Sequence, residues 1–401
     1  MRKSILTPEL ESKVTRAVDD LKGELVKLTQ RLTKIQSLSG EEEEVQSFVK
    51  SQLLEIGFSV KSFAKDPRRP NLIANLQGNR EHPCILYIAH VDNIPPGETS
   101  SWSVPPYEAR IVGERIVGRG VADMKAGLAA MIIAAKAIKD SQVPMEGTFS
   151  IAAVVDEEVE SKYGMRYLAE NRLIKADAAI FGEPSFPYID IALKGGVWLK
   201  LKVLGKSVGS GWPQNGINSV TKMAKILLEL EKIDLGNRTH PFLGRPTISP
   251  GTTIRGGTMI HSIPELCEAT VDIYTVPGQT KDEIISLVRN CVERLQREDP
   301  ELKVEIETIF EAEPYEIDLQ EKVLQDLQSS IEAVFGRKAE LRGVPSVGDA
   351  RFLGKLGIPA IPAFGPGEKG KGHVADESVS IETLVQVTKV YALLALRTWS
   401  V

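Results

Sequence analysis

The chain is poor in cysteine, in aromatic residues and in net charge, and each shortage excludes a class of protein. Its 401 residues include only three cysteines, Cys84, Cys267 and Cys291. Their wide spacing excludes a disulfide framework and a thiolate metal site. Aromatic residues make up 6% of the chain and the net charge is -5, so the sequence lacks the basic, aromatic-rich stripe of a nucleic-acid binder. We therefore expect no nucleic-acid partner.

Long apolar runs are also missing from the sequence. No run reaches the roughly 20 residues that cross a membrane. The N-terminus begins Met1-Arg2-Lys3 and lacks the apolar core of a signal peptide. We expect a cytoplasmic protein with no membrane partner. The remaining composition, 42% hydrophobic and 26% charged residues, is ordinary for a soluble globular chain whose length favours two domains.

Short β-branched runs alternate with helical periodicity in the first part of the chain and again after residue 311. This alternation predicts crossover units and a mostly parallel sheet in an α/β fold. The predicted strands are 59–63, 71–76, 84–89, 147–155, 178–181 and 360–364. The predicted helices lie within 8–56, broken at 37–40, and at 128–139, 319–335 and 381–399.

Between residues 195 and 310 the order of elements changes to βαββαβ, the ferredoxin-like split unit. Its predicted elements are strand 197–204, helix 217–230, strands 252–257 and 268–275, helix 281–297 and strand 303–308. We therefore expect a discontinuous outer domain, 1–194 with 311–401, and a compact inserted domain, 195–310.

Acidic and imidazole side chains collect where the strands of the outer domain end or in glycine-rich loops. Taken singly, each is more often a solvated carboxylate or a satisfied histidine. Together, in one cleft at the strand ends, they would carry too much negative charge to coexist without cations. Two histidines and several carboxylates suit zinc, and two-metal sites are the usual place for a shared carboxylate. The residues are His90, Asp92, Asp123, Glu157, Glu158, Glu183 and His373.

Five short motifs contain these residues and follow one another in a fixed order. They are His90-x-Asp92, Gly118-Arg-Gly-x-x-Asp123-Met-Lys, Asp156-Glu157-Glu158, Gly182-Glu183-Pro-Ser, and Gly365-Pro-Gly followed by His373 and Glu377. In combination they resemble the di-zinc amidohydrolases and exopeptidases that include acetylornithine deacetylase, succinyl-diaminopimelate desuccinylase, aminoacylase and glutamate carboxypeptidase. The similarity covers nearly the whole chain.

The resemblance implies two zinc ions per chain, with cobalt or manganese as substitutes. Asp123 would bridge the ions. His90 and Glu183 would complete one site, and Glu158 and His373 the other. Asp92 would orient His90, Glu157 would be the general base, and the peptide bond after Asp123 would be cis.

The implied reaction is hydrolysis of an amide bond in a small N-acyl amino acid or dipeptide, by a metal-bridging hydroxide with Glu157 as the base. The resemblance also implies a zinc-hydrolase catalytic domain with an inserted ferredoxin-like lid, through which two chains form a homodimer. We call residues 195–310 the lid from here on.

The lid departs from the family at positions expected to contact the substrate or the oxyanion. Gly209 stands where the family has a histidine that donates to the oxyanion of the partner's site, and His261 where it usually has asparagine. Tyr274 stands where an arginine usually grips the substrate carboxylate, and Arg351 lies beside replaced hydroxyl residues. His261 is either a replacement donor or a simple strand-end histidine. Tyr274 is more simply a packed aromatic, and Arg351 is more simply a partner of Asp349 or Glu377 than a substrate contact.

These departures leave alternatives to a fully active deacylase. One is a catalytically weakened metal-binding dimer that acts by binding, which Gly209 favours and the intact Glu157 opposes. The other is a di-zinc carboxypeptidase or aminopeptidase.

Overall fold

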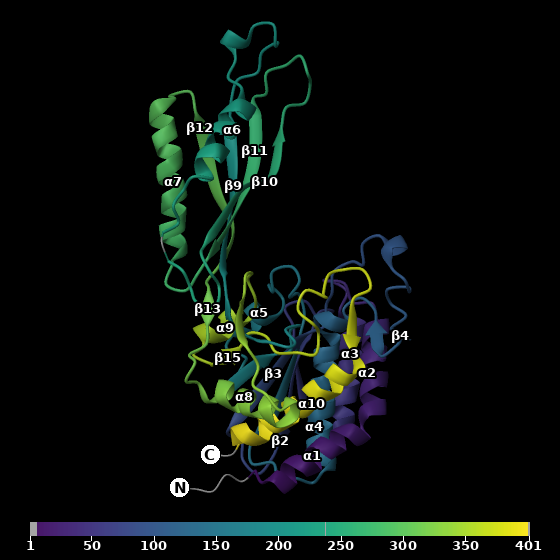
Figure 1. Cartoon of the computed structure of the whole chain (residues 1–401). Helices are drawn as coiled ribbons and strands as arrows, with labels where there is room; N and C mark the ends of the chain where they lie inside the picture. The colour runs from purple at the N-terminus through teal and green to yellow at the C-terminus, as the bar shows by residue number, and fades with distance from the viewer. Residues whose placement is uncertain (1–5, 237, 400–401) are drawn as a thin grey trace. The chain divides into compact units, whose positions relative to one another are not determined.

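The computed structural model describes residues 6–236 and 238–399, and the chain divides into two compact units (Figure 1). The first unit contains the chain up to Ile191 together with Ile317–Arg342 and the residues from Phe352 onward. The second unit contains Ala192–Glu316 and Gly343–Arg351. The short segment 343–351, expected in the outer domain, thus groups with the unit that contains the lid.

The first unit is built on a six-stranded sheet with the order β1-β2-β6-β3-β7-β15. Strands β6, β3, β7 and β15 pair in parallel, whereas β2 pairs antiparallel with both β1 and β6. This mixed α/β sheet, mostly parallel at its centre, is the predicted fold class. The strands are β1 (Ser59–Phe63), β2 (Asn71–Gln77), β3 (Cys84–His90), β6 (Thr148–Val154), β7 (Ala178–Phe181) and β15 (Ala360–Ile361).

Helices cover this sheet because each presents an apolar face to it. Helix α4 (Ala126–Asp140) is rich in alanine and almost wholly buried, which lets it pack closely on β3 and β6 and on α10 (Ile381–Trp399). Helix α3 (Glu43–Ile56) packs on β1 and β2, and it ends at Gly57, whose φ of 103° suits glycine. The other helices of this unit are α1 (Pro8–Asp20), α2 (Lys22–Lys34), α5 (Met165–Glu170) and α8 (Lys322–Phe335).

Most of the shorter strands belong to two small three-stranded sheets. Strands β4 (Arg110–Val112), β5 (Arg115–Val117) and β16 (Ser378–Ser380) form one sheet, with the order β16-β5-β4. Strands β8 (Ile189–Leu193), β13 (Tyr315–Glu316) and β14 (Leu341–Val344) form the other, where the chain passes from one unit to the next. The short helix α9 (Ala350–Lys355) follows β14.

The second unit has the predicted βαββαβ order. Its four strands form an antiparallel sheet with the order β10-β11-β9-β12, and α6 and α7 lie along it (Figure 1). Alternate residues of β9, including Val197, Leu199 and Leu201, pack with both helices in one apolar core. The elements are β9 (Gly195–Leu204), α6 (Ser219–Leu230), β10 (Thr247–Gly256), β11 (Leu266–Thr275), α7 (Lys281–Glu298) and β12 (Lys303–Ala312).

Three predicted elements differ clearly from the structure in extent. The strand predicted at 252–257 begins five residues earlier, as β10 (Thr247–Gly256). The helical stretch 8–34 is two helices rather than one. The strand predicted at 360–364 has only two ladder residues, because the amide of Phe364 donates to Phe181 and that of Ala363 to Asp190. Within the described residues, no helix combines the length and apolarity needed to span a bilayer.

Candidate metal centre

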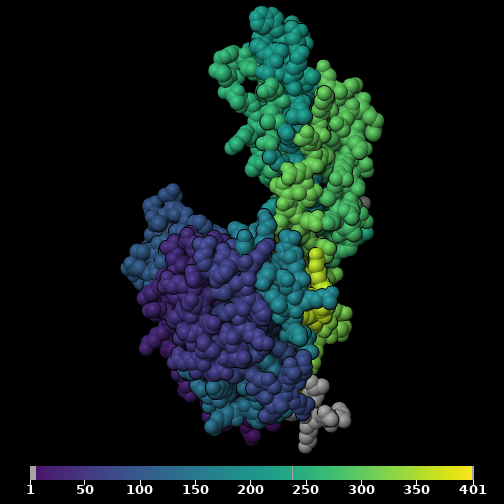
Figure 2. All heavy atoms as spheres, turned by 180° about the vertical axis from the view of Figure 1, so that it is seen from behind, coloured from purple at the N-terminus to yellow at the C-terminus, as the bar shows by residue number. Residues whose placement is uncertain are grey.

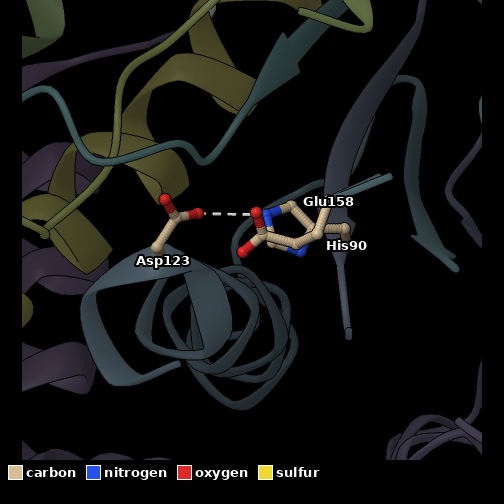
Figure 3. Close-up of side chains that lie close together, drawn as sticks. All are labelled: His90, Asp123 and Glu158. Carbon is tan, nitrogen blue, oxygen red and sulfur yellow. Dashed lines mark hydrogen bonds and ion pairs between the residues drawn. The ribbon is translucent and has the colours of Figure 1, made fainter. Parts of the chain in front are cut away.

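His90 is placed by β3, a wholly buried strand of the sheet. All seven residues of β3 are buried, and His90 is its last residue, with a side chain only 2% exposed. Its Nδ1 lies 2.9 Å from the backbone oxygen of Asp92. A hydrogen on Nδ1 would donate to that carbonyl, which fixes the ring and leaves Nε2 as the atom available to a cation. Nε2 faces Asp123 (Figure 3).

Asp123 lies in a tight turn, Val121–Lys125, just before helix α4. The turn begins after Gly120, whose φ is 78°, and the Asp123–Met124 peptide bond is cis, as the resemblance implies. Glu377 Oε1 accepts the backbone amides of Ala122 at 2.8 Å and Asp123 at 3.1 Å. Buried Glu377 therefore holds the turn that presents the Asp123 carboxylate.

The carboxylate of Asp123 lies between two imidazoles. Its Oδ1 is 3.0 Å from His90 Nε2, and its Oδ2 is 3.4 Å from His373 Nε2. Glu183 Oε1 lies 3.7 Å from His90 Nε2, and Glu158 Oε1 lies 3.0 Å from His373 Nε2. Ligand atoms of His90, Asp123 and Glu158 also all lie within 4.8 Å of one another. The five side chains thus form two histidine–carboxylate pairs, one on each side of Asp123.

Asp92 contacts its neighbours in two different ways. Its backbone carbonyl faces the His90 ring, while its carboxylate is 3.7 Å from His90 Nδ1. The two carboxylate oxygens instead accept the backbone amides of Glu157 and Glu158, each at 3.2 Å. Ser39 Oγ donates to the same carboxylate at 2.8 Å. Asp92 therefore couples the position of His90 to the turn that carries Glu157 and Glu158.

The pKa values of the cluster indicate a local excess of negative charge. Removal from water raises the pKa of Glu183 to about 7, and the charges of Asp123 and Glu158 add to this effect. Burial also raises the pKa of Asp92 to about 6. The hydrogen bond to Glu158 raises the pKa of His373 to about 9. Ionisation of Glu183 and Asp92 therefore has a cost that nearby positive charge would offset.

This donor set fits a pair of divalent cations. It offers two imidazole nitrogens and carboxylates from Asp123, Glu158 and Glu183, which are the nitrogen and oxygen ligands that zinc prefers. The carboxylate of Asp123 has one oxygen toward each histidine–carboxylate pair, as a shared ligand would. A bound cation would also offset the excess of negative charge.

Several supporting residues have no role predicted from the sequence, although Arg119 and Glu377 lie within the motifs. Arg119 donates to Glu377 at 2.6 Å, and both side chains are buried. Arg69 bonds both Glu42 and Asp156, each at 2.6 Å, and so ties the start of α3 to the residue before Glu157. In the sequence, the acidic run Glu41–Glu44, which contains Glu42, indicates only the start of a helix. A charged residue that is buried and paired is recognisable only once its burial is known.

The four lid-related residues of the prediction all lie in the second unit. Segments 205–217 and 257–264 come together at one end of that unit (Figures 1 and 2). There Gly209 pairs with Ser262, and the amide of Ser210 donates to the carbonyl of His261 at 2.9 Å. The structure therefore brings Gly209 and His261 together on two adjacent loop segments.

Tyr274 and Arg351 have different surroundings. Tyr274 is half-buried on β11 and alternates with the core residues Val271 and Ile273, so its side chain is on the sheet face away from the helices. Arg351 is buried, donates to the carbonyl of Gly348 at 2.7 Å and lies 3.9 Å from Asp349.

Comparison with known proteins agrees with the geometry of the centre. Residues 86–397 match the family described as Peptidase family M20/M25/M40. The chain belongs to this family. The matched range contains every candidate metal ligand, from His90 to His373.

Two characterised relatives of this M20 chain show how varied the substrates of similar proteins are. It is 28% identical over 405 residues to N-formyl-4-amino-5-aminomethyl-2-methylpyrimidine deformylase of Halalkalibacterium halodurans, covering 93% of each chain. It is 27% identical over 382 residues to succinyl-diaminopimelate desuccinylase of Pelagibacter ubique, covering 92% of this chain and 97% of that one.

A solved structure shows the same fold. The M20 family metallo-carboxypeptidase Sso-CP2 from Sulfolobus solfataricus superposes with a TM-score of 0.79 at 20% identity, covering 94% of this chain and 99% of the other.

Proposed function

We propose that this M20 chain hydrolyses the amide bond of a small N-acyl amino acid or dipeptide, using two metal ions held by the centre described above. The observation that carries the proposal is the position of Asp123, with Oδ1 at 3.0 Å from His90 and Oδ2 at 3.4 Å from His373. A bridging carboxylate would reach a separate metal ion with each oxygen, and each Asp123 oxygen lies next to a different imidazole that could bind one of those ions.

Five side chains would coordinate the two ions. His90 and Glu183 would hold one ion, Glu158 and His373 the other, and Asp123 both. Zinc is the metal that this donor set suits best, and cobalt or manganese would substitute. Two such ions supply Lewis acidity, which polarises the scissile carbonyl and lowers the pKa of water.

Glu157 is the proposed general base and acid. Its backbone amide is fixed by Asp92, and the next residue, Glu158, is a proposed ligand. The Glu158 carboxylate lies 3.0 Å from His373 Nε2, so we assign Glu158 to a metal and its neighbour Glu157 to the proton transfers. Glu157 takes a proton from the attacking water and returns it to the departing amine. Such transfers typically contribute about 10²–10⁴-fold to a rate.

We further propose that two chains assemble through the lid. Helix α6 and the edge strand β10 contact each other, and each exposes a large apolar side chain. Leu228 on α6 is 58% exposed and Ile254 on β10 is 55% exposed. An unpaired strand edge next to exposed apolar side chains suits a second copy that continues the sheet.

A second candidate function is binding without efficient turnover. Gly209 carries no side chain that could donate to an oxyanion, and this supports it. The complete set of ligands and Glu157 favour the hydrolase.

The test is a panel of acyl amines incubated with zinc- or cobalt-loaded protein. The panel contains acetyl-, succinyl- and glutamyl-linked amino acids, with a formylated amine because one relative is a deformylase. We expect hydrolysis of at least one class, and loss of that hydrolysis by at least about 100-fold in Glu157→Gln. Glu160→Gln, a nearby change outside the cluster, is the matched control. Metal-loaded protein that hydrolyses none of the panel would favour the binding function.

A further inference from the structure

The first unit contains a cavity that none of the candidate metal ligands lines. It has a volume of about 170 Å³, and we call it the Phe186 pocket. It lies between the loop that follows Glu183 and the C-terminal end of α8. Its lining includes Phe186, Tyr188, Ile331, Phe335, Phe364 and the segment 337–340.

The walls of the Phe186 pocket suit one flat apolar ring. Ile331 and Phe364 are 3% and 1% exposed and form a buried apolar floor. The rings of Phe186 and Phe335 contact each other, with centroids 5.5 Å apart and planes inclined by 40°, and together form one aromatic wall. An apolar cavity of about 150 Å³ is large enough to bind benzene, so this volume accommodates a single aromatic ring.

The rim of the pocket is positively charged. Arg337 and Lys338 line it and are both exposed. Among the residues that the structure describes, no carboxylate forms an ion pair with either of them, whereas the lining acid Glu340 is paired with Arg342 at 3.1 Å. An anion at the rim would therefore meet two available cations and an acid that is already neutralised.

The pocket also touches both loops that lead to metal ligands. Phe186 follows Glu183 by three residues, and its amide donates to the carbonyl of Gly367 at 3.1 Å. Phe364 precedes the loop that contains His373, and its amide donates to Phe181 at 2.9 Å. The cavity is thus framed by ordered backbone, which keeps it open at low conformational cost.

We propose that the Phe186 pocket is a binding site for a small single-ring aromatic carboxylate. The ring would pack against the Phe186–Phe335 pair over the apolar floor, and the carboxylate would reach Arg337 and Lys338. Offset or edge-on contacts with the two rings favour an aromatic ligand over an aliphatic one of equal size. The site is separate from the proposed hydrolysis and does not depend on it.

The test uses 4-fluorobenzoate and metal-loaded protein, with binding followed by ¹⁹F NMR. A ligand of this size should bind with a dissociation constant of about 1 mM. In R337Q/K338Q this dissociation constant should rise by about five-fold or more, because both changes remove exposed cations without altering the apolar walls. Phe335→Leu should also weaken binding, because it removes one ring of the aromatic wall.

Two controls separate this pocket from other sites. K13Q/K61Q removes the same charge from exposed positions elsewhere and should leave the affinity unchanged. The neutral analogue 4-fluorobenzyl alcohol should bind more weakly than the acid to the unaltered protein. Absence of binding at about 10 mM acid, or equal affinity in R337Q/K338Q and the unaltered protein, would overturn the proposal, since a carboxylate at the metal centre would not respond to those two residues.

Discussion

The carboxylate of Glu377 accepts the backbone amide of Asp123 at 3.1 Å, although 254 residues separate the two in the chain. The same oxygen accepts the amide of Ala122, and the other oxygen accepts from Arg119 at 2.6 Å. All of the Glu377 side chain is buried. One buried glutamate thus sets the backbone of the residue proposed to bridge two metals.

We predict that Glu377→Gln weakens metal binding without removing any ligand. The amide has one acceptor oxygen, so its NH₂ group would face either Arg119 or the backbone amides. Loss of such a supporting hydrogen bond typically costs about 10–100-fold in metal affinity. Leaving Arg119 buried without its partner should also lower the free energy of unfolding by about 3 kcal/mol. Competition with a chromophoric chelator and denaturant unfolding would measure the two effects.

The control for this change is Glu382→Gln, an exposed glutamate on the first turn of α10. It should alter neither quantity appreciably. Unchanged metal affinity in Glu377→Gln would contradict the positioning role of Glu377.

We predict that removal of one histidine ligand lowers the metal content from two ions per chain to one. The unaltered chain should hold two ions, and His373→Ala should hold one, because His90, Glu183 and Asp123 remain on the other side of the centre. His240→Ala, which removes a histidine paired with Glu316 in the second unit, should still hold two. Elemental analysis after removal of excess zinc gives the counts. A count of one in the unaltered chain would show that Asp123 does not bridge.

We predict that Gly209→His raises turnover by about 10- to 100-fold on any substrate that is cleaved, because a single oxyanion donor is worth about 10²–10³-fold. The change should not disturb folding. A Cβ at this position would meet only the Trp212 ring, at an ordinary distance of 3.5 Å. The measurement is kcat for the unaltered protein, Gly209→His and His261→Ala. An unchanged kcat in Gly209→His together with a lost one in His261→Ala would assign the donor role to His261, whose carbonyl already bonds the residue after Gly209.

Assembly through the lid predicts that the homodimer depends on exposed Leu228 and does not depend on exposed Leu54. Leu228→Lys should convert a homodimer to a monomer at micromolar concentration, because a charge would be buried in the contact. Leu54→Lys on α3, where the leucine is 52% exposed in the first unit, should leave the dimer intact. Light scattering after size exclusion distinguishes the two states. A monomeric unaltered protein would refute the proposed dimer.

The pair of His82 and Asp177 should make stability depend on pH in a defined window. Their side chains meet at 2.6 Å, and this hydrogen bond raises the pKa of His82 above 6.5. Burial would raise the pKa of Asp177, but the bonds from His82 and the Cys84 amide outweigh it and lower that pKa below 3.8. The pair therefore stabilises the fold fully between about pH 3.8 and 6.5, less as pH rises through the pKa of His82, and less as pH falls through that of Asp177.

The comparison that checks this window is the free energy of unfolding of the unaltered protein and of His82→Gln at several pH values. The difference should be small, because both side chains are largely exposed. It should be greatest near pH 5 and disappear above the raised pKa of His82. A difference that grows with pH would contradict the assignment.

The sequence by itself determined the architecture and the identity of the candidate ligands. Hydrophobic periodicity depends on local spacing, so the β-branched run ending at His90 and the helix 381–399 were both predictable. The βαββαβ order of the lid followed from the same patterns. The motifs around Asp123 and Glu158 indicated candidate ligands through their resemblance to the motifs of the family.

Only the tertiary structure decided how these residues are connected. The sequence predicts that Asp92 orients His90, but not by which atoms: the carbonyl lies 2.9 Å from the ring nitrogen and the carboxylate 3.7 Å from it. The carboxylate also accepts the amides of Glu157 and Glu158. The partnership of Glu377 with the Asp123 turn and the aromatic wall of the Phe186 pocket likewise join distant parts of the chain. A hydrogen bond or a cavity of this kind depends on burial and distance, which the fold creates and local sequence spacing does not specify.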